Sequence, residues 1–191
     1  MPPIPRDNDD KPAIGHNTGT FLMVFPPMAS PPMKQITRVE LVDLAAQASE
    51  APRLRANRNL HPELQDPVQR LAIGMEPGTY VRIHRHPHTW ELLTPLNGRF
   101  VVLNFDDQGI VTARAVLGED CAVLETPANT WHAVLSLDVS GVIFEVKQGA
   151  YQPIAEQDYW PGSPAEGEPG TEQVMAWYAV AQVGDSLAFL N

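Results

Sequence analysis

The sequence predicts an all-β domain of many short strands, and three features indicate it. The chain has 191 residues with 19 prolines and 13 glycines, a composition that favours turns over long helices. From about residue 69 onward, short apolar stretches alternate with turn sequences. Hydrophobic residues make up 43% of the chain, enough to bury one core. We therefore expect a single β-sandwich or β-barrel.

The strands and turns follow from this alternation. Asn97-Gly98 lies between two apolar runs and predicts a β-hairpin. Cys121, the only cysteine, has apolar neighbours, so we expect a small buried side chain in a strand. The expected strands cover residues 69–75, 79–86, 91–95, 99–105, 111–117, 121–124, 132–137 and 142–147.

A short helix is expected before the strands. Thr37 and Glu40 have the spacing of a capping box, and the helix should end before Pro52. Residues 171–182 predict a second, closing helix. Two further features of the first helix are an expected staple of Ile36 with Leu41 and an apolar stripe of Val39, Val42 and Ala46.

These elements divide the chain into four parts. The first part is proline-rich and has no strand or helix period, so it is either a flexible arm or an extension that precedes a natural start at Met33. The expected parts are a leader over 1–33, a helix and loop over 34–66, the barrel over 67–152 and a C-terminal extension over 153–191.

Charge and composition exclude several classes of function. The net charge of −10 disfavours binding to nucleic acid or to an anionic membrane. One cysteine cannot form an internal disulfide, so nothing in the sequence indicates an oxidising compartment. No apolar run approaches the roughly 20 residues that span a bilayer. We expect a soluble, cytoplasmic protein.

Histidines and a carboxylate are clustered around one expected strand. His84 and His86 are two residues apart, so on a strand both imidazoles face the same side. Pro87 interrupts the strand and lets Glu91 turn back toward them. His132 opens a later strand and adds a third imidazole.

Three imidazoles and one carboxylate suit a divalent transition metal: iron, manganese, nickel, copper or zinc. Calcium and magnesium prefer oxygen ligands, so they fit poorly. On a five- or six-coordinate metal the four ligands leave a position for water or substrate. The ligand set does not choose among these metals.

The spacing of this cluster resembles the first cupin motif. Gly78, His84, His86, Glu91 and Gly98 follow its pattern of turn glycines, paired histidines and glutamate. The resemblance implies a cupin jelly-roll barrel, also called a double-stranded β-helix, with irregular termini.

The second cupin motif is less regular. His132 is retained after Pro127. Asn129 stands where glycine is usual, and it tolerates a left-handed backbone. Ser136 stands where asparagine is usual.

Residues 55–168 also resemble the WbuC family of cupin-fold metalloproteins. The resemblance implies the barrel and the metal, and the members of the family resemble proteins found with polysaccharide genes; it implies no established reaction. The matching pieces are Arg58-Asn59-Leu60-His61, Asp66-Pro67-Val68-Gln69-Arg70, Pro77-Gly78-Thr79-Tyr80-Val81, His84-Arg85-His86-Pro87, Trp90-Glu91, Phe105-Asp106, Trp131-His132, Phe144-Glu145-Val146-Lys147 and Gly149-Ala150-Tyr151.

Strand parity extends the site beyond the metal ligands. Tyr80 and Arg82 should face inward with the histidines, while Val81 and Ile83 face outward and need cover from the N-terminal segment or from a second subunit. We therefore expect a homodimer. A desolvated Arg82 indicates either an anionic ligand or an ion pair, for example with Glu145.

Three polar residues precede the barrel. Arg58, Asn59 and His61 lie in an expected loop, where such side chains are usually solvated. The WbuC resemblance instead implies that they line the mouth of the pocket and bind substrate. His88 breaks the parity and is expected at the surface.

Three functional hypotheses remain. In the first, a metalloenzyme acts on a small anionic or sugar-derived substrate, with Tyr80 or Glu145 moving protons. In the second, the barrel is a non-catalytic, metal-dependent binding module or sensor. In the third, it is a metal-free sugar isomerase or epimerase with His84 as base, which the complete ligand set disfavours. The sequence names neither the substrate nor the reaction.

Overall fold

The structure is a computed structural model that describes residues 32–190 and the side chains up to residue 188. The chain divides into two units, Met1–Met33 and Lys34–Asn191. The description below concerns the second unit. The predicted leader falls almost entirely outside the described residues. No helix in the described part of the chain is long and apolar enough to cross a membrane.

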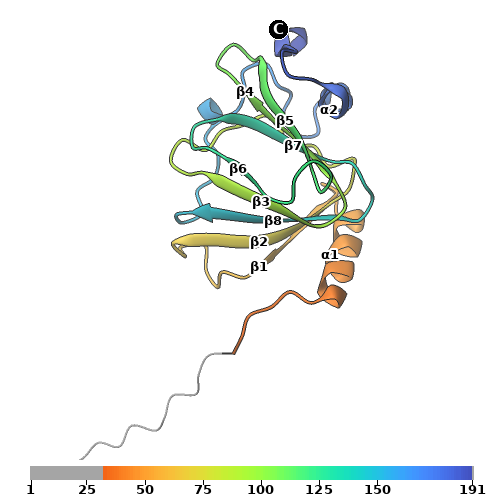
Figure 1. Cartoon of the computed structure of the whole chain (residues 1–191), viewed down its shortest axis with the longest axis vertical. Coiled ribbons are helices and arrows are strands. Elements are labelled where there is room, and N and C mark those ends of the chain that lie inside the picture. The colour runs from red at the N-terminus through yellow and green to blue at the C-terminus, as the bar shows by residue number, and fades with distance from the viewer. Residues whose placement is uncertain (1–31, 191) are drawn as a thin grey trace, which may run out of the picture. The chain divides into compact units, whose positions relative to one another are not determined.

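The second unit is an all-β jelly roll of the cupin type, as predicted (Figure 1). One antiparallel sheet has the order β1-β2-β8-β3-β6 and the other has the order β5-β4-β7. The sheets form separate ladders, so the barrel is open. The strands are β1 (Arg55–Asn59), β2 (Val68–Met75), β3 (Glu91–Asn97), β4 (Phe100–Phe105), β5 (Val111–Leu117), β6 (Leu124–Thr126), β7 (Trp131–Ser136) and β8 (Gly141–Gln148).

The core forms because β4 is apolar on both faces. Phe100 and Val102 pack with residues of the five-stranded sheet, such as Leu93 and Ile143. The alternate residues of β4 join a second cluster that includes side chains of α2 (Thr171–Val180). The three-stranded sheet is therefore covered by the other sheet on one face and by the C-terminal helix on the other.

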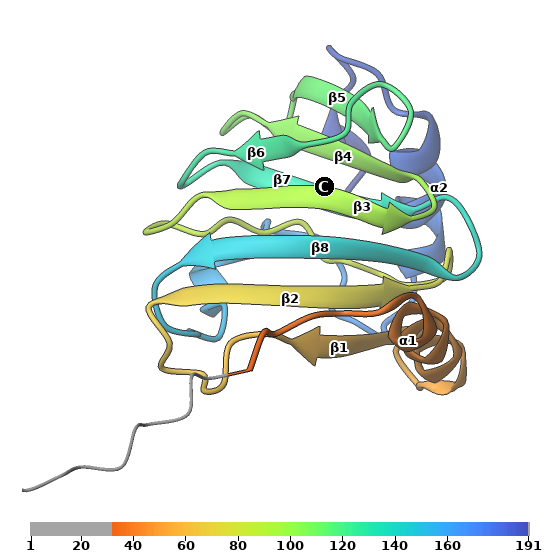
Figure 2. The same ribbon diagram turned by 60° about the horizontal axis from the view of Figure 1, so that its bottom comes forward.

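Helix α1 (Arg38–Glu50) begins with the predicted capping box. The backbone N–H of Glu40 donates to Thr37 Oγ1, and the backbone N–H of Thr37 donates to the Glu40 carboxylate at 2.7 Å. The predicted stripe was wrong, because Val39 and Val42 are each 69% exposed. Leu44, Ala45 and Ala48 are buried instead. Figure 2 shows α1 beside β1 and β2.

The hairpin predicted at Asn97-Gly98 was wrong. Gly98 does make a turn with φ +76°. However, β3 pairs with β6 and β8, while β4 pairs with β5 and β7. The turn therefore carries the chain from one sheet to the other. Two apolar runs joined by Asn-Gly look the same in sequence for either arrangement.

Three other local predictions differ from the structure. Residues 79–90 form no regular strand, although His84 makes isolated bridges to His132 and Tyr159. Strand β1 lies where a loop was expected. Cys121 is half-buried and makes only an isolated bridge to Leu117.

Within residues 32–190, three short helices follow the last strand, and one of them, α2, is the closing helix predicted over residues 171–182. The short η1 (Glu156–Asp158), α2 and η2 (Leu187–Leu190) belong to the C-terminal part of the unit. Ile83 is fully buried in the same cluster as Tyr178 of α2. Tyr178 also donates a hydrogen bond to the Val81 carbonyl at 3.2 Å. The chain's own C-terminal helix thus supplies for Ile83 the cover that was expected from a second subunit or from the N-terminal segment. Val81, also expected to face outward, instead lines the cavity and packs against the inner cluster.

Candidate metal centre

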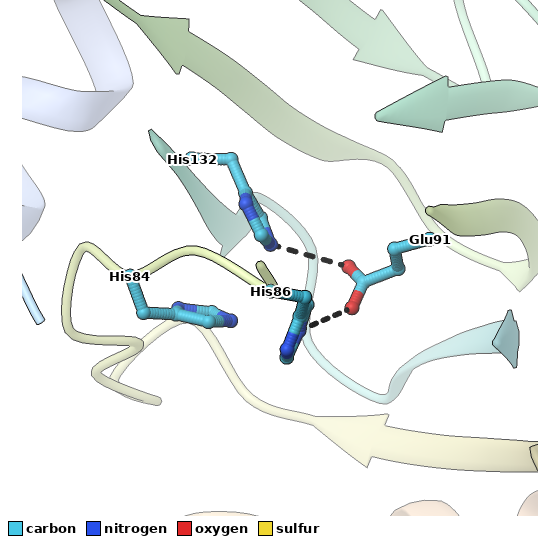
Figure 3. A group of neighbouring side chains, drawn as sticks. All are labelled: His84, His86, Glu91 and His132. Atoms are coloured by element: carbon cyan, nitrogen blue, oxygen red, sulfur yellow. Dashed lines mark hydrogen bonds and ion pairs between the residues drawn. The ribbon is translucent and has the colours of Figure 1, made fainter. Parts of the chain in front are cut away.

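Four side chains, those of His84, His86, Glu91 and His132, point toward one another (Figure 3). His84 and His86 come from the irregular segment 79–90, Glu91 opens β3, and His132 lies on β7. One donor atom from each residue lies within 4.8 Å of the others. Glu91 and His132 are almost fully buried, at 4% and 1% exposed. The structure therefore brings together the four residues that the sequence singled out as metal ligands.

Backbone hydrogen bonds fix the positions of two of these histidines. The His84 N–H donates to the His132 carbonyl at 3.1 Å, and the His132 N–H donates to the His84 carbonyl at 2.8 Å. The His86 carbonyl accepts a hydrogen bond from the N–H of Asn129 at 2.8 Å. Asn129 has φ +61°, the left-handed backbone that was predicted for it. The degenerate second motif thus still forms the turn that brings His132 to the first motif.

Hydrogen bonds also orient two of the rings. His84 Nδ1 lies 2.8 Å from the Arg82 carbonyl, and His132 Nδ1 lies 2.9 Å from the Thr130 carbonyl. A carbonyl oxygen only accepts, so each Nδ1 carries the proton. Each Nε2 is then left with a lone pair. This is the arrangement by which backbone groups fix the tautomer of metal-binding histidines.

The Nε2 atom of His132 provides a test of whether a metal fits. It is buried and has no hydrogen-bond partner among residues 32–190. Glu91 Oε1 lies 3.6 Å away, and the other carboxylate oxygen lies 3.2 Å from His86 Nε2. A buried, unsatisfied lone pair is costly, and a cation coordinated by these atoms would satisfy it. The donor set suits a transition metal.

The pKa shifts of His84, His86 and Glu91 favour the forms that bind a metal, and the shift of His132 is the exception. Burial and the neighbouring histidines lower the pKa of His84 well below its usual value, and burial lowers the pKa of His86. Burial alone raises the pKa of Glu91, but contacts with His132 and His86 and the charge of Lys147 hold it well below the usual range. Burial disfavours the charged form of His132, yet its contact with the Glu91 carboxylate raises the pKa overall.

A cavity of about 680 Å³ opens onto this group. His84, His86 and Glu91 line it, together with residues of β1, β2, β3 and β8. Residues after the barrel also contribute, including Tyr159 and Glu166. The volume lies within the roughly 300–1,000 Å³ of typical small-molecule sites.

Lys147 is a residue of this cavity that the sequence reasoning did not select. It faces Glu91 across the β3–β8 ladder. Its Nζ lies 2.7 Å from Glu145 Oε1 and 3.5 Å from Glu91 Oε2. Strand alternation could have found it, because Ile143, Glu145 and Lys147 are two residues apart on β8 and so share one face. All three line the cavity.

Tyr80 and Arg82 line the cavity, but so does Val81 between them, because this segment is not a strand and the predicted alternation does not apply. The partners of Tyr80 and Arg82 also differ from those expected. Tyr80 donates its hydroxyl proton to the Pro164 carbonyl at 3.0 Å, and burial raises its pKa to about 12. This favours a role in tethering the C-terminal segment over proton transfer.

Arg82 does not pair with Glu145. Its Nη1 lies 3.1 Å from Glu156, its Nε donates to Ser163, and its guanidinium lies 4.6 Å from the centroid of the Tyr159 ring. Glu145 pairs with Lys147 because the two are neighbours on the same face of β8.

The three polar residues before the barrel divide by strand parity. Asn59 and His61 line the cavity. Arg58, expected to bind substrate, does not line it and pairs with Glu40 of α1 at 2.9 Å. The reason is that β1 is a strand, whose successive side chains face opposite sides. His88 is exposed, as predicted.

Comparisons with known proteins give little beyond the fold. Residues 36–117 match the family model of a domain of unknown function, DUF6016. No curated protein matches the chain.

Several solved structures are similar in fold at low sequence identity. KdgF from Halomonas sp. is 13% identical, with 54% of this chain and 84% of that chain covered and a TM-score of 0.42. BH2720 from Bacillus halodurans is 18% identical, with 66% and 89% covered and a TM-score of 0.45. The cupin domain of Cnp3 from Schizosaccharomyces pombe is 13% identical, with 51% and 65% covered and a TM-score of 0.39.

Proposed function

We propose that this chain is a metalloenzyme that binds one divalent transition metal and acts on a small anionic or sugar-derived molecule. The observation that carries the proposal is the buried Nε2 of His132, which has no hydrogen-bond partner in the described part of the chain and is directed at Glu91. His84 and His86 complete the group. Iron, manganese, nickel, copper and zinc all suit these ligands.

We further propose a relationship to the WbuC-like cupins, and with it an association with polysaccharide metabolism, a cytoplasmic location and a homodimeric state. The sequence pieces shared with that family support the relationship. The exposed edge of β1 is compatible with pairing between subunits.

A bound metal of this kind polarises a substrate oxygen or activates water or dioxygen. The protein's own residues would do the rest. Glu145 lies in the cavity beside Lys147 and would hold or move a proton. Arg82 would bind an anionic group, and its stacking on Tyr159 would fix the guanidinium.

A screen for turnover tests this proposal. Metal-loaded protein is incubated with sugars, nucleotide sugars and small organic acids, with product analysis and oxygen uptake as readouts. We expect turnover of at least one compound, and we expect Glu145→Gln to lower kcat by about 100-fold at unchanged metal content. Glu125→Gln, at an exposed position on β6, is the matched control.

Two outcomes would count against the proposal. Binding of a compound without turnover would replace the enzyme with a metal-dependent binding module. Full kcat in Glu145→Gln would remove the role proposed for Glu145.

A further inference from the structure

On β2, β8 and β3 the inner face of the five-stranded sheet changes from polar to apolar along the strands, whereas the edge strand β1 places Arg55, Asn57 and Asn59 on the cavity beside Met75, Ile73 and Leu71. At one end, Lys147 of β8 lies between Gln69 of β2 and Glu91 of β3. Two residues further along β8, Glu145 lies between Leu71 and Leu93. Every one of these six residues lines the cavity. The polar end is therefore the end that carries the metal ligand Glu91.

The apolar character increases away from Glu91. Ile73 of β2 pairs with Ile143 of β8, and Met75 follows on β2. These three side chains also line the cavity, and Val134 of β7 joins them. We call Leu71, Ile73, Met75, Leu93 and Ile143 the apolar wall. A molecule bound along this sheet would have a polar group at the metal end and would place the rest of its length on aliphatic side chains.

The charges of the cavity indicate the sign of its ligand. The lining contains the cations Arg53, Arg55, Arg82 and Lys147 and the carboxylates Glu91, Glu145 and Glu166. The lining without a metal thus has one cation more than it has carboxylates, and Arg82 is paired with Glu156, which does not line the cavity. The whole chain, in contrast, has a net charge of −10. A bound divalent cation would increase this local excess. Such a cavity attracts anions against the field of the whole molecule.

Arg82 is the cation best placed to exchange its partner for a ligand. Its side chain is only 17% exposed, whereas its ion-pair partner Glu156 is 80% exposed. A pair with so exposed a carboxylate contributes little to stability. The anionic group of a ligand could replace Glu156 at modest cost and would form a more desolvated, stronger contact.

We propose that the cavity binds a small carboxylic acid with a hydrocarbon body, aliphatic or aromatic, rather than a sugar. This inference rests on the proposed function, because it names the substrate class of the same site. The body lies on the apolar wall and the cavity cations, Arg82 foremost, hold the carboxylate. A sugar in the same place could reach the Asn57 and Asn59 amides on β1 with one edge only. Its other hydroxyl groups would be buried against aliphatic side chains that offer no hydrogen bonds, which is unfavourable.

Three matched compounds test the inference by calorimetry on the full chain. 4-Phenylbutyrate has the charge and the apolar body, 4-phenylbutyramide has the body without the charge, and glucuronate has the charge on a polar body. We expect 4-phenylbutyrate to bind at least about tenfold more tightly than either of the others. Equal or tighter binding of glucuronate, or no binding of 4-phenylbutyrate, would overturn the inference.

Two variants separate the contributions of body and charge. Ile73→Ser should lower the affinity for 4-phenylbutyrate by about tenfold and leave the affinity for glucuronate unchanged. Arg82→Met should lower the affinity for 4-phenylbutyrate to the affinity that the wild type has for 4-phenylbutyramide. Leu71→Ser serves as a second wall variant if Ile73→Ser fails to fold. Val123→Ser is the control, because Val123 is 57% exposed and does not line the cavity. Wild-type affinities in both wall variants would contradict the inference.

The metal content of the same samples separates this inference from the proposed function. Protein that holds no metal but still prefers 4-phenylbutyrate would support the acid site and contradict the metalloenzyme. Metal-loaded protein that prefers glucuronate would contradict the inference of a hydrocarbon carboxylic acid and would leave the proposed metal site standing.

Discussion

Replacing His132 with alanine is expected to lower the affinity for a transition metal by more than about 100-fold, because supporting residues outside the ligand set already cost 10- to 100-fold. The remaining His84, His86 and Glu91 would lose the ligand that comes from the second motif. Competition titration against a chelator of known affinity measures the change. Circular dichroism checks that the variant is folded.

The matched control is His88→Ala. His88 is exposed and lies outside the group of four. The substitution His88→Ala removes one histidine from the same segment of the chain without removing a ligand, so the affinity for the metal should stay at the wild-type value. Equal affinity in His132→Ala and His88→Ala would show that His132 binds no metal.

Replacing Lys147 with methionine is expected to destabilise the metal-free protein by about 3 kcal/mol at neutral pH, as is typical when one partner of a buried ion pair is removed. Its side chain is 21% exposed, and the two carboxylates that it contacts, Glu91 and Glu145, are 5% and 11% exposed. Without Lys147 these carboxylates would face each other with no cation between them. Urea unfolding of chelator-treated protein measures the change.

A double variant identifies the cause of this loss. Lys147→Met combined with Glu145→Gln removes both partners of the 2.7 Å pair, and it should recover much of the stability lost in the single variant. A single variant as stable as the wild type would show that Lys147 does not compensate the buried carboxylates.

The motif spacing predicted the site better than it predicted the local structure. His84, His86, Glu91 and His132 come together, although the strand parity used to place the first two does not apply. Residues 79–90 form no regular strand. Backbone hydrogen bonds between His84 and His132 position the rings instead. Such long-range contacts leave no periodic signal in the sequence.

Predictions that depended on which strands pair were the least successful. The turn at Asn97-Gly98 was correct, but the pairing of β3 with β8 rather than with β4 is set by the whole topology. Arg58 was wrongly expected to line the cavity, because the strand that turns its side chain away was taken for a loop. In contrast, the capping box at Thr37 depends on residues three apart, and the structure contains it as predicted.

Elemental analysis of the purified full chain tests the central claim most directly. The chain is saturated with iron, manganese, nickel, copper and zinc in turn, freed of loose metal by gel filtration and measured for each element. We expect about one equivalent of at least one transition metal per chain, since the four ligands form one site. Clearly less than one equivalent of every metal would contradict the account.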